Sequence, residues 1–196
     1  MKRLALALTA LALAALSGCV SPVGPVQVTR FHAADVSPLG KGAIAVESAP
    51  GSDAGSLEWQ TYSAAVTRQL ILLGYTEDRL GSGGQVALVR LSRRTIEPQR
   101  SSPVSVGVGG STGTYGSGVG LGIGINLSPK PAAEVATDLS VSIRDRTSGA
   151  TLWEGRATFV VSSKSPLATT ALGAPKMSEA LFAGFPGQSG TTIEVK

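Results

Sequence analysis

Two stretches in the second half of the chain place apolar residues at every second position over most of their length. One face of residues 134–145 carries Val135, Thr137, Leu139, Val141 and Ile143, and one face of residues 151–161 carries Trp153, Ala157, Phe159 and Val161. Alternation with a period of two is typical of a half-buried β-strand. The intervening Arg-Thr-Ser-Gly sequence has the composition of a turn. Together these stretches predict an antiparallel β-hairpin.

A helical pattern occupies residues 56–73. Apolar residues recur there at steps of three and four, at Tyr62, Val66, Leu70 and Leu73, with Leu57 and Ala65 on or near the same stripe. Such spacing forms the apolar stripe of an amphipathic helix, and Gly74 follows where a C-cap glycine is expected. We expect the stripe to pack against the sheet that contains Leu139, Val141 and Trp153.

Shorter patterns complete the expected fold. Residues 26–31, 43–46 and 85–91 predict strands, residues 166–184 contain a modest helix, and the chain ends in a turn and a strand. A strand, a helix and a further strand in succession favour a helix packed on a sheet. The sequence therefore predicts an α+β fold, in which a mixed or antiparallel sheet carries one or two helices on one face.

Glycine is abundant in residues 103–127, which have the sequence PVSVGVGGSTGTYGSGVGLGIGINL. Aliphatic residues alternate with glycine or serine on both sides of a central turn-like segment. This alternation predicts an inserted β-hairpin with one apolar face and one face of nearly bare backbone. Because glycine weakens strands, a whole glycine face indicates close approach by another backbone or a ligand. The alternative is a low-complexity insertion that orders only in part.

The spacing of these glycines excludes a nucleotide-binding loop. A dinucleotide fingerprint requires glycines at offsets of zero, two and five, but Thr112 and Ile123 occupy the last position of the two nearest matches. No Gly-Lys-Ser/Thr sequence closes a phosphate loop either. The glycine face of the second strand is instead a candidate binding surface, and it contains Gly120, Gly122 and Gly124.

A second candidate surface is the polar, basic segment of residues 92–102. Arg93, Arg94 and Arg100 suit contact with phosphate or lipid headgroups, and the alternative interpretation is a solvated hairpin end. No aromatic residues interleave with these arginines to stack bases, so nucleic acid is not an expected partner. Removing Lys2 and Arg3 from the 17 basic residues leaves 15, against 13 acidic ones. This balance does not favour a polyanionic partner.

The first residues of the chain have the three parts of a bacterial leader. Lys2 and Arg3 are followed by an uninterrupted run of Leu, Ala and one Thr over residues 4–16. This run is too short for a transmembrane helix, which needs roughly 20 residues, and it suits the apolar region of a signal peptide. The Leu-Ser-Gly-Cys tetrapeptide of residues 16–19 resembles the bacterial lipobox. We therefore expect residues 1–18 to form a lipoprotein signal peptide.

Cys19 is the only cysteine of the chain, so it has no intramolecular disulfide partner. The lipobox resemblance implies that Cys19 is acylated and becomes the mature N-terminus, and two or more acyl chains anchor a protein firmly. Residues 19–25 would form a short linker to a single domain over residues 26–196. Val20 follows the cysteine where an acidic residue would signal retention. The expected location is the periplasmic face of the outer membrane.

Catalytic and metal-binding patterns are sparse. His32 is the single histidine and has Asp35 three residues later, but no serine stands in a nucleophile elbow. Asp138, Asp145 and Glu154 lie on the expected hairpin, where Asp145 is best explained as a cap of the turn. No cluster of ligands has metal-binding spacing. We expect no catalytic residue, metal or cofactor, and we expect that the protein is not an enzyme.

Three segments resemble a family of envelope lipoproteins known only as domain of unknown function 4136. They are SLEWQTYSAAVTRQLILLGY, DLSVSIRDRTSGATLWEGRA and LFAGFPGQSGTTIEVK. The resemblance implies an α+β domain on a lipid anchor and transfers no catalytic residue. The expected function is a non-catalytic module that binds or scaffolds an unknown envelope protein or lipid. The alternative is a carrier or chaperone for an apolar envelope molecule, with the glycine-rich hairpin as one wall of a groove.

Overall fold

The computed structural model describes residues 23–98, 104–113, 116–125 and 131–196, and its main body is one seven-stranded sheet. The sheet contains β1 (Val26–His32), β2 (Ala43–Ser48), β3 (Thr76–Glu77), β4 (Gln85–Ile96), β7 (Glu134–Asp145), β8 (Thr151–Ser162) and β9 (Thr192–Val195). Their order across the sheet is β3-β2-β4-β7-β8-β1-β9. All neighbours are antiparallel except β2, which runs parallel to both β3 and β4. The sheet is therefore mixed.

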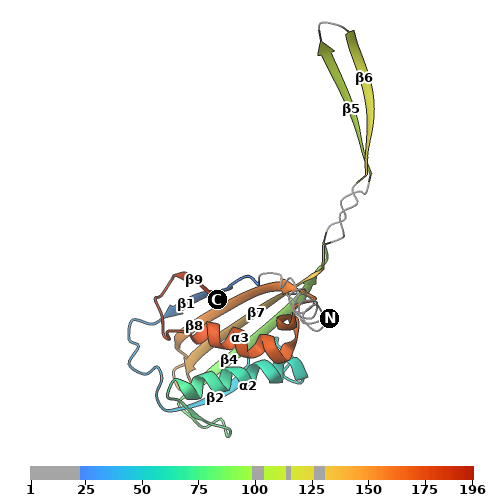
Figure 1. Cartoon of the computed structure of the whole chain (residues 1–196). Coiled ribbons are helices and arrows are strands. Elements are labelled where there is room, and N and C mark those ends of the chain that lie inside the picture. Colours follow the sequence, from blue (N-terminus) through green and yellow to red (C-terminus); the bar gives the residue numbers. More distant parts are fainter. Residues whose placement is uncertain (1–22, 99–103, 114–115, 126–130) are drawn as a thin grey trace, which may run out of the picture.

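Two helices cover one face of this sheet. Figure 1 shows α2 (Leu57–Leu72) and α3 (Thr170–Phe182) side by side across the strands, and a short 3-10 turn over Pro166–Ala168 precedes α3. The ends of α2 follow the sequence expectation: Ser56 Oγ accepts a hydrogen bond from the Trp59 backbone N–H, and Gly74 follows the helix with a φ of 103°. The α+β class is confirmed.

The hydrophobic core lies between the helices and the sheet. As expected, Tyr62, Val66 and Leu70 of α2 belong to one buried cluster together with Leu139, Val141 and Trp153 of the sheet. Leu57 does not belong to it, because its side chain is 79% exposed. Nine residues at about 100° each place Leu57 on the side of the helix opposite Val66. The stripe therefore begins at Tyr62, and including Leu57 in it was wrong.

Strand β4 extends beyond the apolar stretch of the sequence that predicted it. The sequence predicted a strand over residues 85–91, but β4 pairs with β7 from Gln85 to Ile96 without interruption. Backbone hydrogen bonds of a ladder do not depend on apolar side chains, so the polar residues continue the strand with one face in solvent. Residues 92–96 form the end of the β4–β7 pair and are exposed except at Arg93, which fits the expected solvated hairpin end at the other four positions. Strand β3, only two residues long, had no counterpart in the expected elements.

The glycine-rich insertion forms a second, two-stranded sheet. β5 (Val104–Gly113) pairs antiparallel with β6 (Gly116–Ile125), and Figure 1 draws this hairpin apart from the main sheet. The expected hairpin is present, although its strands extend through most of the segment that was expected to turn. Within the part of the chain that the structure describes, no helix is long and apolar enough to cross a bilayer.

Arg30 is a buried cation on the core-facing side of β1. Its guanidinium donates hydrogen bonds to the carbonyls of Leu181 and Ala180, at 2.9 Å each, and only 4% of the residue is exposed. Burial lowers the pKa of Arg30 from its usual value. A positive charge at a helix C-terminus interacts favourably with the helix dipole. Arg30 thus fastens the end of α3 to the sheet.

Trp153 closes the core near the same end of α3 by folding over a glycine of its own strand. Its ring stacks on Phe182 with a centroid separation of 5.3 Å, and its Nε1 donates to the Pro186 carbonyl at 2.9 Å. A Cβ atom on Gly155 would lie 2.8 Å from Cζ2 of Trp153 and 2.9 Å from Cδ1 of Leu181. The glycine is required here because the indole occupies the space of a side chain.

Gly155→Ala is therefore expected to destabilise the protein by about 1–3 kcal/mol, as overpacking of a filled core does. Chemical denaturation followed by tryptophan fluorescence measures this change. Gly84→Ala is the matched control, because a Cβ there meets no atom within 4 Å; its effect should stay within about 0.5 kcal/mol. Equal stability of the two variants would contradict the packing of Trp153 over Gly155.

Candidate functional site: a cleft at the open edge of β2

Arg93, one of the arginines proposed for headgroup binding, is held by contacts within the domain. Its guanidinium donates to the Glu58 carboxylate, to Thr170 Oγ1 at 3.0 Å and to the Ala168 carbonyl, and its side chain is 19% exposed. These partners lie at the beginnings of α2 and α3. A cation near helix N-termini opposes their dipoles, and Glu58 in the first turn of α2 offsets this cost. Arg93 therefore joins β4 to both helices.

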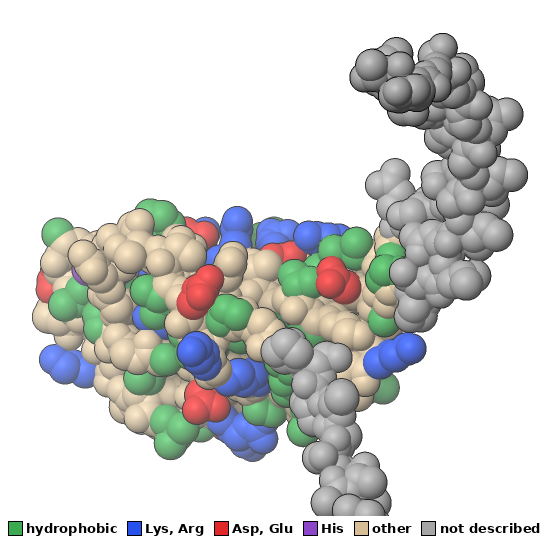
Figure 2. Space-filling model, turned by 45° about the horizontal axis from the view of Figure 1, so that its top comes forward, with side chains coloured by type: hydrophobic (Ala, Val, Ile, Leu, Met, Phe, Trp, Pro, Cys, Tyr) green, Lys and Arg blue, Asp and Glu red, His purple; other side chains and the backbone are tan. Residues whose placement is uncertain are grey.

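Arg94 faces the opposite side of the sheet, so the structure does not bring the two arginines together. It forms an ion pair with Asp138 at 3.1 Å, and 62% of its side chain is exposed. Such an exposed pair contributes about 0–1 kcal/mol and leaves the guanidinium open to other anions. Figure 2 shows basic and acidic side chains interspersed over the described part of the viewed face. A single-sign electrostatic field is not formed on that face.

The remaining candidate residues, the glycines of β6 and Cys19, do not lie on the strand that carries the two arginines. The register of the glycine-rich hairpin sets Gly120, Gly122 and Gly124 of β6 opposite Gly109, Gly107 and Ser105 of β5. These glycines belong to the separate two-stranded sheet, not to the sheet that contains the arginines. The lipidation residue Cys19 and the expected signal peptide lie outside the described residues.

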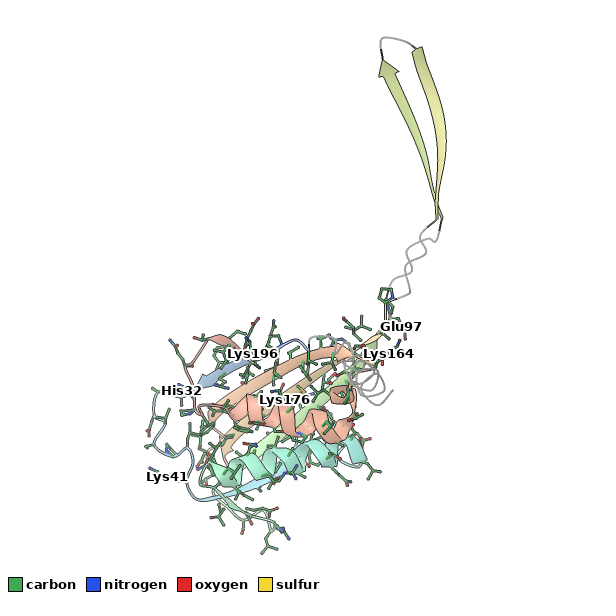
Figure 3. All side chains as sticks on the ribbon, viewed as in Figure 1. His32, Lys41, Glu97, Lys164, Lys176 and Lys196 are labelled. Atoms are coloured by element: carbon green, nitrogen blue, oxygen red, sulfur yellow. The ribbon has the colours of Figure 1, made fainter. Side chains whose placement is uncertain are left out.

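His32 and its neighbouring carboxylates form local contacts. His32 Nδ1 lies 2.7 Å from the Ala33 carbonyl oxygen, and Figure 3 places this histidine at the end of the sheet opposite Glu97 and Lys164. Asp145 Oδ1 accepts hydrogen bonds from the Ser148 backbone and hydroxyl, at 2.7 and 2.8 Å, which lower the pKa of Asp145. The expected turn cap is confirmed. Among the described residues, no group of His, Cys, Asp and Glu side chains could hold a metal ion.

A cleft of about 500 Å³ runs along the outer edge of β2. Its floor is formed by Ala45, Val46 and Glu47 of β2, one wall by Trp59, Ser63, Ala64 and Thr67 of α2, and the other wall by Glu77, Asp78, Arg79, Leu80 and Gly81. The helical wall is lined mainly by small side chains. This leaves the strand at the floor accessible from outside.

The floor of the cleft is an unpaired strand edge. β3 pairs only with Ala43 and Ile44 of β2, and the Ile44 carbonyl accepts from the Asp78 N–H at 2.9 Å. Successive residues of a strand direct their backbone groups to opposite sides. Val46 and Ser48 therefore direct their N–H and C=O groups to the same side as Ile44, beyond the end of β3. Such an edge is a template for another strand.

The loop that forms the second wall is held in place by Asp78. Its carboxylate accepts from the backbone N–H of Leu80 at 3.0 Å and from that of Gly83, and these bonds lower the pKa of Asp78. Gly83 is needed because a Cβ there would lie 2.8 Å from the Ala43 carbonyl oxygen. The wall is thus formed before any ligand arrives. At its rim Leu80 is 91% exposed.

Trp59 supplies the aromatic surface of the cleft. It is half-buried, and its Nε1 donates to the Val89 carbonyl at 3.2 Å, which fixes the orientation of the ring. Two ion pairs lie at the rim, Glu47 with Arg146 at 2.5 Å and Glu77 with Arg79 at 3.1 Å. A fixed aromatic ring, small side chains and an open strand edge together suit an extended polypeptide. No sequence pattern indicated this cleft, because β3 was not expected.

Comparison with known proteins gives distant structural similarity alone. No family model matches the chain, and no curated protein matches it. A PDZ domain protein from Parabacteroides distasonis shares 12% identity with a TM-score of 0.49, over 88% of this chain and 39% of that one. A PelC dodecamer from Paraburkholderia phytofirmans shares 13% identity with a TM-score of 0.45, over 84% and 99% of the two chains. Similarity at this level carries no inference about function.

Proposed function

We propose that this protein is an outer-membrane lipoprotein, anchored through Cys19 on the periplasmic side, that binds an extended segment of another envelope protein. In this function the domain is a non-catalytic scaffold or adaptor. The observation that carries the proposal is the open edge of β2 at the floor of a preformed cleft. In strand addition, main-chain hydrogen bonds supply affinity and side-chain pockets supply specificity.

The dimensions of the cleft favour a short strand. Residues 45–48 of β2 extend beyond β3 and, at about 3.3 Å per residue, offer roughly 13 Å of edge. The added strand would set alternate side chains against the α2 wall, where Ser63 and Ala64 allow close approach, and against Leu80 on the other side. The acidic and basic side chains at the rim form two ion pairs, so a segment without a large net charge fits best.

Photo-crosslinking in intact envelopes tests this function. Benzoylphenylalanine at Ser63 or at Thr67, both in the cleft wall, is expected to capture one protein, with crosslinks that map to one contiguous segment. The same residue at Gln60 or Arg68, exposed positions of α2 that do not line the cleft, is the matched control and should capture little. Crosslinks to lipid from the cleft would instead favour the carrier of an apolar molecule.

A backbone substitution separates strand addition from other binding modes. Val46→Pro removes the N–H that faces the cleft, and proline is tolerated where that N–H is not used by the ladder. We expect it to abolish crosslinking from Ser63 while the far-UV circular dichroism spectrum stays native. Unchanged crosslinking in Val46→Pro, or equal capture from Gln60, would refute binding at the β2 edge.

A further inference from the structure

The glycine-rich hairpin has an unusual distribution of charge and apolar residues. Residues 101–129 contain no Asp, Glu, Lys, Arg or His, and Arg100 and Lys130 flank this span. Most long strands exposed to water carry charges that prevent pairing with other chains. Within the described residues, β5 and β6 pair only with each other, so each also has a free edge. An uncharged hairpin with two free strand edges is poorly suited to exposure to water.

The strand register sorts the hairpin into two faces. Aliphatic residues pair with aliphatic residues, at Val104 with Ile125, Val106 with Ile123 and Val108 with Leu121. Between these pairs, glycine or serine stands opposite glycine. Because neighbouring residues of a strand lie on opposite faces, one face holds the aliphatic pairs and the other holds the glycine and serine positions. The hairpin is amphipathic without any charged residue.

The length of the strands matches the hydrocarbon layer of a membrane. β5 and β6 contain 10 residues each, and strands that cross a bilayer typically contain about 9–11 residues. At about 3.3 Å per residue and a tilt near 45°, ten residues span roughly 23 Å. Such strands alternate apolar residues toward lipid with small or polar residues away from it. β5 and β6 have this length, and aliphatic residues alternate with glycine or serine over residues 104–108 of β5 and 119–125 of β6.

We propose that this hairpin inserts into a lipid bilayer, with its aliphatic face against the acyl chains, and pairs edge to edge with the hairpins of other copies of this chain. The pairing between copies follows from the bilayer, since an unpaired backbone N–H or C=O costs several kcal/mol in hydrocarbon. A single hairpin would expose two such edges. In the sequence, the basic residues Arg100 and Lys130 flank the uncharged span, and basic residues are favourable near headgroups. This inference is independent of the cleft at β2.

Fluorescence quenching in vesicles tests the insertion. The full chain is reconstituted into vesicles of phosphatidylethanolamine and phosphatidylglycerol, with a single NBD-labelled cysteine at Leu121, Ile123, Gly120 or Gly122. Labels at Leu121 and Ile123 are expected to be quenched by nitroxide-labelled acyl chains, and labels at Gly120 and Gly122 by aqueous iodide. The chain without an introduced cysteine, treated with the same NBD reagent, shows whether Cys19 itself becomes labelled. Iodide quenching at all four positions, or no alternation between them, would overturn the proposal.

Charge substitution on neighbouring residues gives a matched pair. Leu121→Arg should lower the ratio of inserted to uninserted chains about thirtyfold or more, since an arginine facing lipid costs about 2–4 kcal/mol, whereas Gly120→Arg should leave most chains inserted. The label for this measurement is at Ile123, and circular dichroism melting checks that the main domain remains folded. An equal effect of the two substitutions would contradict the assignment of the aliphatic face to lipid.

Dilution tests the pairing between copies. When vesicles carry on average fewer than one chain each, lipid quenching of the label at Ile123 should be lost, because the hairpin edges have no partner. Insertion that persists at this dilution would refute pairing with other copies. A hairpin that binds only a protein partner would show no lipid quenching in these pure vesicles at any dilution. That result would overturn insertion and leave binding at the β2 cleft unaffected.

Discussion

Replacing Cys19 with serine is expected to release the protein from the membrane fraction into the soluble periplasm, or to leave its leader uncleaved. Serine has no thiol to acylate, and without acyl chains the anchoring free energy of about 0.8 kcal/mol per buried methylene is lost. Fractionation and the mass of the mature N-terminus measure both outcomes. A Cys19→Ser protein that is processed and still fractionates with membranes would contradict the lipoprotein assignment.

Val20→Asp is the matched control for this experiment. It keeps Cys19, the expected acylation site, and introduces an acidic residue at the position where such a residue signals retention. The protein is therefore expected to remain membrane-bound but to move from the outer to the inner membrane, as sucrose-gradient separation of the two membranes would show. Loss of all membrane association in Val20→Asp would indicate that the substitution impairs processing rather than sorting.

Leu70→Ala is expected to lower the free energy of unfolding by about 2–5 kcal/mol, the range found when a buried leucine is truncated in a core. Leu70 is fully buried and packs in the cluster between α2 and the sheet. Truncation removes apolar contacts and leaves a cavity that the surrounding side chains fill only in part. Urea denaturation, with the slope and the midpoint both fitted, measures the change.

Leu72→Ala on the same helix isolates the effect of burial. The two leucines undergo the same chemical change, but Leu72 is 77% exposed. Its substitution should alter stability by no more than about 0.5 kcal/mol, and alanine has the higher helix propensity. If the two variants unfold at the same denaturant concentration, α2 does not pack on the sheet through the face described.

The stretches with strong periodicity were predictable from the sequence because their structure is decided by near neighbours in the chain. The hairpin of β7 and β8 follows from alternation on both sides of a turn that Asp145 caps. Helix α2 follows from its apolar stripe and from Gly74 after its end. The β5–β6 hairpin follows in the same way. In each case the side-chain period and the turn residues select one local conformation.

The roles of single charged residues were not predictable in the same way. Arg93 belongs to a polar, basic segment, which suggested a solvated or headgroup-binding residue, yet it joins the beginnings of two helices through Glu58 and Thr170. Arg30 is buried at the end of α3, whereas the neighbouring Phe31 is 54% exposed. A residue's polarity does not reveal which distant carbonyl or carboxylate will lie beside it.

By itself, the sequence determined the α+β class, the long hairpins and the first helix, because these depend on local periodicity and short motifs. Only the tertiary structure decided the strand order, which places β2 between β3 and β4. That order creates the open edge and the cleft beside it, from segments as distant as Ala45 and Leu80. Pairing between distant strands depends on the whole assembled core, and no local pattern encodes which edge remains free.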